Sequence, residues 1–146
     1  MIRKAEIKDL SRIAEVLVFV KRMNYRSIFH NDDFSFNNLQ VLKVAEEYEK
    51  PEILEHFWVY DDCFVKGMIR IEGREIVELY VDFFFQKEGI GSELIEFAKQ
   101  EFDADHMWVL ERNVDAIRFY EAHGFHMTGT RKLEENSIEY LVKMER

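Results

Sequence analysis

Residues Glu75–Phe102 read EIVELYVDFFFQKEGIGSELIEFAKQEF and join an apolar-rich stretch to an amphipathic one through two glycines. The first part predicts a strand over residues 75–82, and the apolar residues after Gly91 recur at helical spacing. A glycine where a strand turns into a helix lets the backbone approach a ligand closely, because it has no Cβ. The first amides of a helix lack intrahelical partners and carry partial positive charge, so this junction is typical of a diphosphate site. An ordinary tight turn would carry the same two glycines.

Length and composition predict one globular domain over residues 1–146. The chain is 47% hydrophobic and 14% aromatic, which excludes a disordered tail and provides for one core. Its formal net charge of -9 argues against a nucleic-acid partner, which would require clustered Lys and Arg, and favours a cationic substrate.

Other sequence features bear on cellular location and on metals. No uncharged run is long enough to cross a bilayer, and the charged N-terminus does not resemble a signal peptide. We therefore expect a cytoplasmic protein with no membrane partner. The single cysteine, Cys63, excludes an internal disulfide, and the absence of a Cys/His cluster predicts that no metal is bound.

The patterns along the chain predict elements in the order β-α-α-β-β-β-α-β-α-β-β. Asp9 is a predicted N-cap for a first helix that fades near Arg22, and residues 23–37 are expected to be irregular and aromatic. The second helix, over residues 38–49, should stop at Pro51, and Asn113 is the predicted N-cap of the last helix. The expected strands are 2–6, 54–60, 63–72, 75–82, 106–110, 125–132 and 138–144.

A second motif lies at residues 108–125, WVLERNVDAIRFYEAHGF. It resembles the later signature of the GNAT N-acetyltransferase superfamily, Asn-x-x-Ala-x-x-Phe-Tyr followed by Gly-Phe. The sequence QKEGIG at residues 86–91 resembles that family's Arg/Gln-x-x-Gly-x-Gly/Ala loop, and the opening residues and the element order also fit. Phe83 stands where the family often has a proline, which leaves the local loop path unpredicted. The resemblance covers essentially the whole chain.

The resemblance implies a single-domain α/β (α+β) fold, with a central mixed, mostly antiparallel sheet flanked by helices. It also implies acetyl-CoA as cosubstrate and a primary amine as acceptor, which attacks the thioester directly through a tetrahedral intermediate. Lys87 is a candidate for a phosphate contact, and Ser92 can add a hydroxyl. The cofactor residues expected on this basis are Leu79, Tyr80, Val81, Gln86, Lys87, Glu88, Gly89, Ile90, Gly91, Ser92, Asn113, Ala116 and Phe119.

Two glutamates are candidates for the general base. A lysine-like amine has a pKa of about 10.4, so fewer than roughly one molecule in a thousand is neutral at pH 7 and a proton must be removed. Glu78 is the first choice and Glu75 the second, and a solvated or salt-bridged strand residue is the alternative for either. Strict alternation puts Glu75 on the face of Val77, and Glu78 on the face of Ile76 and Tyr80, whereas a bulge would change this.

Tyr120 resembles the family's general acid, although from the residues alone it would be a core aromatic. Proton transfer from its phenol to a thiolate would be unfavourable by roughly 2 kcal/mol, so a hydrogen bond to the departing sulfur is the energetically easier role. The oxyanion would be stabilised by a backbone N–H of the strand at residues 79–81.

The sequence leaves three functions open. The leading hypothesis is an amine N-acetyltransferase, the second is a non-catalytic acyl-CoA-binding or sensing module with the same fold, and the third is an unrelated α/β interaction domain. The acceptor, a small-molecule or protein amine of cationic character, is not identified, because acceptor recognition lies in variable loops. A homodimer is compatible with the sequence, which does not decide the oligomeric state.

Overall fold

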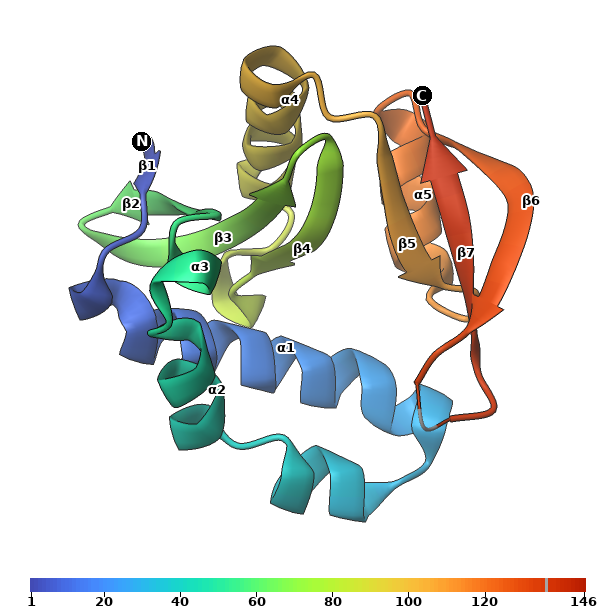
Figure 1. Cartoon of the computed structure of the whole chain (residues 1–146), viewed down its shortest axis with the longest axis horizontal. Coiled ribbons are helices and arrows are strands. Elements are labelled where there is room, and N and C mark those ends of the chain that lie inside the picture. Colours follow the sequence, from blue (N-terminus) through green and yellow to red (C-terminus); the bar gives the residue numbers. More distant parts are fainter. Residues whose placement is uncertain (136) are drawn as a thin grey trace.

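A seven-stranded sheet in the order β1-β2-β3-β4-β5-β7-β6 forms the centre of the molecule (Figure 1). The computed structural model describes residues 1–135 and 137–146. Every neighbouring pair is antiparallel except β4 with β5, so the predicted mixed, mostly antiparallel sheet is confirmed. The strands are β1 (Ile2–Lys4), β2 (Phe57–Asp62), β3 (Phe64–Glu72), β4 (Glu75–Val81), β5 (His106–Leu110), β6 (His126–Leu133) and β7 (Tyr140–Glu145).

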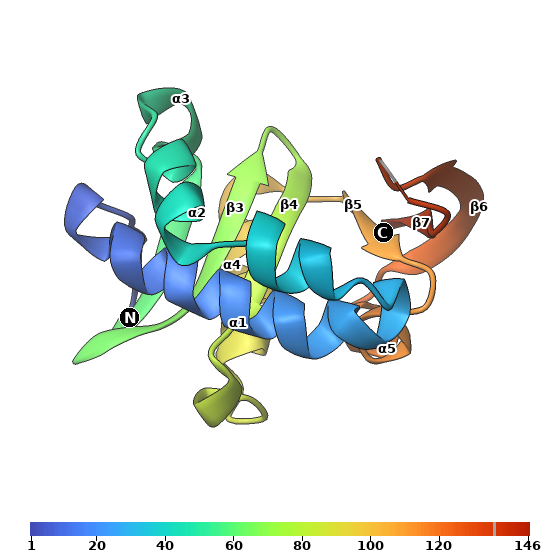
Figure 2. The same cartoon turned by 90° about the horizontal axis from the view of Figure 1, so that it is seen from below.

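Helices cover both faces of this sheet (Figures 1 and 2). α1 and α2 lie against one face, and α4 and α5 lie against the other. The helices are α1 (Leu10–Phe29), α2 (Val41–Tyr48), α3 (Pro51–Leu54), α4 (Ile90–Phe102) and α5 (Val114–Ala122), with short turns η1 (Ile7–Asp9), η2 (Phe34–Asn38, a π-helix) and η3 (Phe83–Phe85).

The core consists of two layers separated by the sheet, and β3 contributes to both. Met68 points toward α1 and packs with Leu17, whereas Ile69 points toward α4 and packs with Leu94. All four side chains are almost completely buried. Successive strand residues alternate between the two faces, so a strand covered by helices on both sides is apolar at consecutive positions.

The first helix is longer than predicted. α1 continues past Arg22 to Phe29 and ends at His30, whose φ of 50° is left-handed. No glycine or proline interrupts this segment, and Tyr25 stacks on Phe29 one turn later, with ring centroids 5.7 Å apart. The prediction of an irregular segment over residues 23–37 is therefore wrong for its first part and for η2. Arg22 also donates to the backbone oxygen of Ser35 at 2.8 Å, which fastens the returning chain to α1.

Pro51 acts differently from the prediction. It does follow α2, but it also occupies the first position of the short helix α3, where a missing N–H is harmless. The strand predicted from residue 54 therefore begins three residues later, at Phe57. β2 and β3 form a hairpin whose turn lies at Cys63, in a left-handed conformation between Asp62 and Phe64.

We expect Leu94→Ala to lower the free energy of unfolding by about 2–5 kcal/mol, because the side chain is 0% exposed between α4 and the sheet. Leu42→Ala on α2 is the matched control, since Leu42 is 82% exposed and its loss should change stability by less than about 0.5 kcal/mol. Urea unfolding followed by tryptophan fluorescence measures both. Equal losses in the two variants would contradict the packing described here.

Candidate active site

The site lies where β4 and β5 separate. The two strands pair only at their first residues, Glu75 with His106 and Ile76 with Met107. Beyond Ile76 the β5-facing edge of β4 has no strand partner among the described residues, and Figure 1 shows the two ribbons standing apart.

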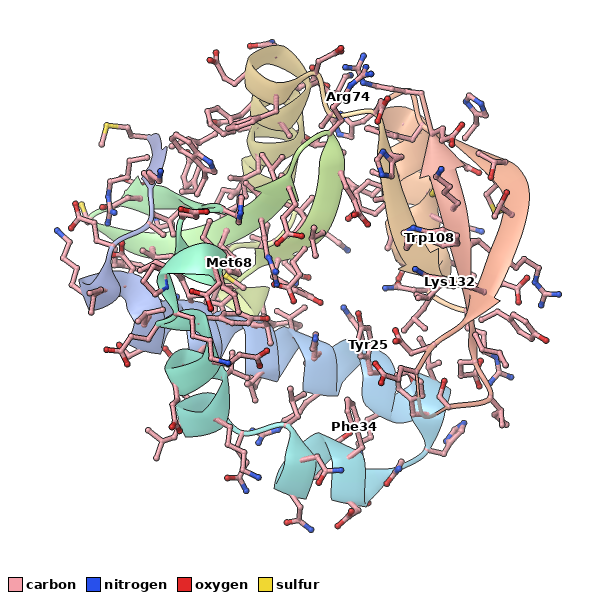
Figure 3. The ribbon with its side chains drawn as sticks, in the orientation of Figure 1. Tyr25, Phe34, Met68, Arg74, Trp108 and Lys132 are labelled. Atoms are coloured by element: carbon pink, nitrogen blue, oxygen red, sulfur yellow. The ribbon has the colours of Figure 1, made fainter. Side chains whose placement is uncertain are left out.

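A cavity of about 840 Å³ occupies this opening. Its walls come from α1, β4, the loop before α4, α5, and the β5-β7-β6 part of the sheet. Figure 3 shows Tyr25 on α1 on one side of the opening, with Trp108 and Lys132 on the other.

Most of the residues predicted for the site line this one cavity. Two do not: Ile90 is 5% exposed and packs into the core beside Leu94, and Glu88 is an exposed loop residue. The predicted residues in the cavity wall are Glu75, Glu78, Leu79, Tyr80, Val81, Gln86, Lys87, Gly89, Gly91, Ser92, Asn113, Ala116, Phe119 and Tyr120.

The two positions of the loop require glycine for different structural reasons. Gly89 is the N-cap of α4 and has a φ of 90°, a conformation that a residue with a Cβ adopts only with strain. Gly91 is helical and lies under Phe119, so that a Cβ at this position would be 3.3 Å from the ring. The first glycine therefore shapes the loop, and the second lets α4 and α5 approach each other.

The loop is also held at its start, where the family's frequent proline is replaced by Phe83. Asp82 accepts a hydrogen bond from the backbone N–H of Phe84 at 2.9 Å and forms an ion pair with Arg12 of α1. The side chain of Gln86 donates to the backbone oxygen of Val81 at 3.1 Å. These contacts define a path that the sequence left unpredicted.

A bulge in β4 determines which way Glu78 points. Arg70 of β3 is opposite Glu78, but the next residue, Ile71, is opposite Ile76, which leaves Val77 as the extra residue. Ile76 therefore packs on the α4 side, whereas Glu78 reaches Tyr48 at the end of α2. The grouping of Glu78 with Ile76 by strict alternation is wrong, and the bulge is the physical reason.

Glu78 is a partly buried carboxylate with a raised pKa. Burial raises the pKa above its ordinary value, and the charge of Lys21 and the hydrogen bond from Tyr48 offset part of the rise. The Tyr48 hydroxyl lies 2.8 and 3.1 Å from the two carboxylate oxygens and donates its hydrogen there. Tyr48 remains a neutral donor, because burial and the Glu78 charge raise its own pKa. Sequence analysis missed Tyr48, since only the tertiary fold brings α2 to β4.

An aromatic wall from α1 and β4 flanks Glu78. The hydroxyls of Tyr25 and Tyr80 are 3.4 Å apart, and the Lys21 ammonium lies 6.0 Å from the centre of each ring. Burial raises the pKa of both tyrosines, so both stay neutral. Tyr25 belongs to the segment that the sequence marks as aromatic, whereas Lys21 has the sequence pattern of an ordinary surface lysine on a helix, so its place in the site was not predicted.

Tyr120 lies in the opposite wall, on α5. Its ring packs against Phe119 and Phe125, with centroids 5.3 and 6.3 Å away. Burial raises the pKa of its hydroxyl above the ordinary value, and the electrostatic influence of Tyr25 adds to the rise. Tyr120 is therefore a neutral phenol that can donate a hydrogen bond.

Asn113 begins the same helix as its N-cap, as predicted. Its side-chain oxygen accepts from the backbone N–H of Ala116 at 3.4 Å. The carboxamide NH₂ keeps two donors for other partners. Lys132 of β6 lies on the remaining wall, with its ammonium 4.1 Å from the centre of the Trp108 ring. Sequence analysis had singled out neither Lys132 nor Trp108.

The described residues contain no group of three or more His, Cys, Asp or Glu side chains arranged to hold a metal ion. Among the same residues, no helix is long and apolar enough to cross a membrane.

Comparison with known sequences connects this geometry to a family. The family model of the acetyltransferase (GNAT) domain matches residues 26–146. The peptidyl-lysine N-acetyltransferase YiaC of Escherichia coli K12 is 30% identical over 83 residues, which are 56% of this chain and 57% of YiaC. The match thus spans little more than half the length of that curated relative.

Comparison with solved structures gives the same fold. The PaiA N-acetyltransferase of Thermoplasma acidophilum, solved with coenzyme A, has a TM-score of 0.71 at 19% identity, over 100% of this chain and 98% of that one. An N-acetyltransferase of Staphylococcus aureus Mu50 has a TM-score of 0.77 at 13% identity, over 99% and 98%. YncA of Salmonella typhimurium, solved with acetyl-CoA, has a TM-score of 0.69 at 18% identity, over 100% and 92%.

The family model covers the glycine loop, the divergent strands and α5, and the shared fold accounts for their arrangement around one cleft. This chain belongs to the GNAT family of acetyltransferases.

Proposed function

We propose that this protein transfers an acetyl group from acetyl-CoA to a cationic primary amine, by direct attack of the amine on the thioester carbonyl. One observation carries the proposal. Glu78, a partly buried carboxylate with a raised pKa, and Tyr120, a partly buried neutral phenol, line the same cleft as the glycine loop that opens α4. A base, an acid and a diphosphate site in one cleft are the parts that this reaction needs.

The cofactor would bind along the edge of β4 and the start of α4. The β5-facing edge of β4 after Ile76 is free of strand pairing in the described structure, so its backbone can bond to an extended pantetheine arm. The free amides at the start of α4 and the Lys87 ammonium suit the diphosphate. The solved relatives that contain CoA or acetyl-CoA support this assignment through their common fold.

Glu78 is the better candidate for the general base. Glu75 lies at the closed end of the cleft, where β4 is still paired with β5, whereas Glu78 lies on the divergent part. The pKa of Glu78 is raised toward neutral pH, and a general base is most effective when its pKa lies near the pH at which the enzyme works. Glu78 would take the ammonium proton directly or through a water, and the Tyr48 hydroxyl would keep the carboxylate oriented.

Tyr120 would act on the leaving sulfur. Because burial raises its pKa, complete proton transfer to a thiolate is unfavourable, and a hydrogen bond to the developing negative charge is the fitting role. A backbone N–H of β4 would stabilise the oxygen of the thioester carbonyl in the same step.

The acceptor class is a cationic amine such as a lysine side chain. The cavity wall contains four carboxylates and three lysines, and the whole chain has a net charge of -9. The carboxylates are those of Glu75, Glu78, Asp115 and Glu134, and the lysines are Lys21, Lys87 and Lys132. YiaC is by name a peptidyl-lysine N-acetyltransferase, which supports a lysine of a protein or peptide as the acceptor.

Glu78→Gln should make the protein more stable at neutral pH while it slows catalysis. The folded-state pKa of Glu78 lies above its ordinary value of 4.5, so between these two pKa values the folded protein holds a proton that the unfolded chain has already lost. Stability therefore falls as pH rises from the unfolded to the folded pKa, and stays reduced above it. We expect a gain on the order of 1 kcal/mol at pH 7 that shrinks at acid pH, with a loss of about 10²–10⁴-fold in kcat/KM.

Chemical unfolding at pH 4 and pH 7, together with acetylation rates, measures both effects. Glu46→Gln on the exposed side of α2 is the control and should alter neither. A Glu78→Gln variant that is fully active would remove Glu78 as the base.

Tyr120→Phe should reduce kcat by about 10²-fold while CoA affinity stays within about twofold, because only the hydroxyl is lost. Tyr140→Phe, at an exposed position of β7, is the control and should retain activity. Single-turnover kinetics isolates the chemical step. A wild-type rate for Tyr120→Phe in that measurement would rule out the acid role.

A CoA-release assay across a panel of amines tests the proposed function as a whole, with lysine peptides, polyamines and uncharged amines as acceptors. For the best cationic acceptor, kcat/KM should fall as the salt concentration rises from about 10 to 150 mM, because the Debye length shrinks from roughly 30 to 8 Å. Acceptors of zero net charge should give a flat response. CoA binding with no turnover of any amine would instead support the non-catalytic module.

A further inference from the structure

A chain of three side chains lies behind the glycine loop and is not used by the proposed chemistry. Ser92 Oγ lies 3.0 Å from His123 Nε2, and His123 Nδ1 lies 3.1 Å from Glu96 Oε1. Ser92 lines the cleft, whereas Glu96 and His123 are not in the cavity wall. The chain therefore leads from the cleft to the junction of α4 and α5.

The fold holds all three groups in place. Ser92 and Glu96 are four residues apart on α4, so they share one face of the helix. His123 is the C-cap residue of α5, and its ring packs at a tilt against Phe119 with centroids 4.7 Å apart. Lys99 donates both to Glu96 and to the backbone oxygen of His123, at 3.0 Å each. The charged groups that face the ring from α4 are thus Glu96 and Lys99.

The carboxylate of Glu96 determines what His123 can do for Ser92. A carboxylate only accepts hydrogen bonds, so the hydrogen of the neutral ring lies on Nδ1 and points to Glu96. Nε2 is then an acceptor, and it takes the hydroxyl hydrogen of Ser92. In this state Ser92 has only lone pairs to offer to the cleft, which an anionic ligand would repel.

We propose that His123 couples binding of the cofactor diphosphate to uptake of a proton, with Ser92 as the relay; this rests on the proposed function of the cleft. The diphosphate needs the Ser92 hydroxyl as a donor. When the hydroxyl turns toward it, Nε2 of His123 takes a proton from solvent and donates to Ser92 Oγ. Ser92 then donates to a phosphate oxygen, and every group in the chain has a partner again.

The charge of the ring supports the same state. An imidazolium between Glu96 and Ser92 places a positive charge behind a site that holds a polyanion, in a chain whose net charge is -9. Glu96 stabilises that imidazolium directly, through the Nδ1–H hydrogen bond.

The affinity for the cofactor should rise as pH falls, because the complex holds a proton that the free protein lacks. Full coupling of one proton corresponds to about a tenfold change in affinity per pH unit. The ligand for the measurement is dephospho-CoA, because the 3′-phosphate of CoA titrates with a pKa of about 6 itself and would add its own proton uptake.

Calorimetry of dephospho-CoA binding at pH 7, in two buffers of different ionisation enthalpy, counts the protons taken up. The wild-type protein should take up a measurable fraction of one proton, and its affinity should increase from pH 8 to pH 6. His123→Gln can donate to Ser92 at any pH, so it should bind with no uptake and a flat pH profile. Ser92→Ala should bind more weakly and also lose the uptake, because the relay is missing.

His126→Gln, at an exposed position of β6, is the matched control and should keep the wild-type uptake. Binding by the wild-type protein without proton uptake would overturn the inference and leave the proposed function intact. Unchanged uptake in His123→Gln would overturn it as well, since another group would then be the proton acceptor. If the wild-type protein binds neither CoA nor dephospho-CoA, the proposed function fails, and this inference fails with it.

Discussion

The separation of β4 from β5 is the constraint on which the rest of the site depends. A strand inside a sheet normally forms hydrogen bonds to a neighbouring strand along both of its edges, but β4 pairs with β5 at only two positions. The sheet stays continuous at the closed end, through Glu75 and Ile76, and opens toward the glycine loop. The opening leaves backbone groups of a central strand accessible, and α1, α4 and α5 form the walls around them.

The opposite edge of β4 is paired with β3 at every residue except Val77, where the bulge lies. This single extra residue changes the face on which Glu78 emerges, and so places a carboxylate against Tyr48 on the α2 side instead of in the core beneath α4. A carboxylate buried in this way makes folding less favourable at neutral pH, and the Tyr48 hydrogen bond and the Lys21 charge offset only part of that loss. A carboxylate whose pKa is raised in this way is typical of functional sites.

α4 serves two purposes with two of its faces. Leu94, Ile95 and Ala98 are completely buried and fix the helix on the sheet. Ser92 and Glu96 face α5, where they meet His123. Because one rigid helix supplies both faces, the position of its first amides is determined by core packing, and the site does not rely on a flexible loop. Gly91 allows the necessary closeness, since a Cβ there would press on Phe119.

The local signals in the sequence were sufficient for the family, the element order and half of the cleft-lining residues. The glycines at 89 and 91, the capping Asn113 and the apolar spacing of α4 act within a few residues of themselves, so they are visible without the fold. The partners of the site were not visible. Tyr48 lies 30 residues from Glu78, Lys21 lies 59 residues from Tyr80, and His123 lies 31 residues from Ser92. The pattern of one helix does not reveal which distant element its polar residues will contact.

The errors have the same origin. α1 extends to Phe29 because the segment after it folds back and packs on it, and Pro51 starts a helix because its N–H is not needed at that position. The bulge at Val77 arises from the pairing of two strands, and periodicity in one strand cannot reveal it. Short-range chemistry thus decided what kind of protein this is, whereas the directions and environments of its reactive groups were decided by contacts between elements that are far apart in the chain.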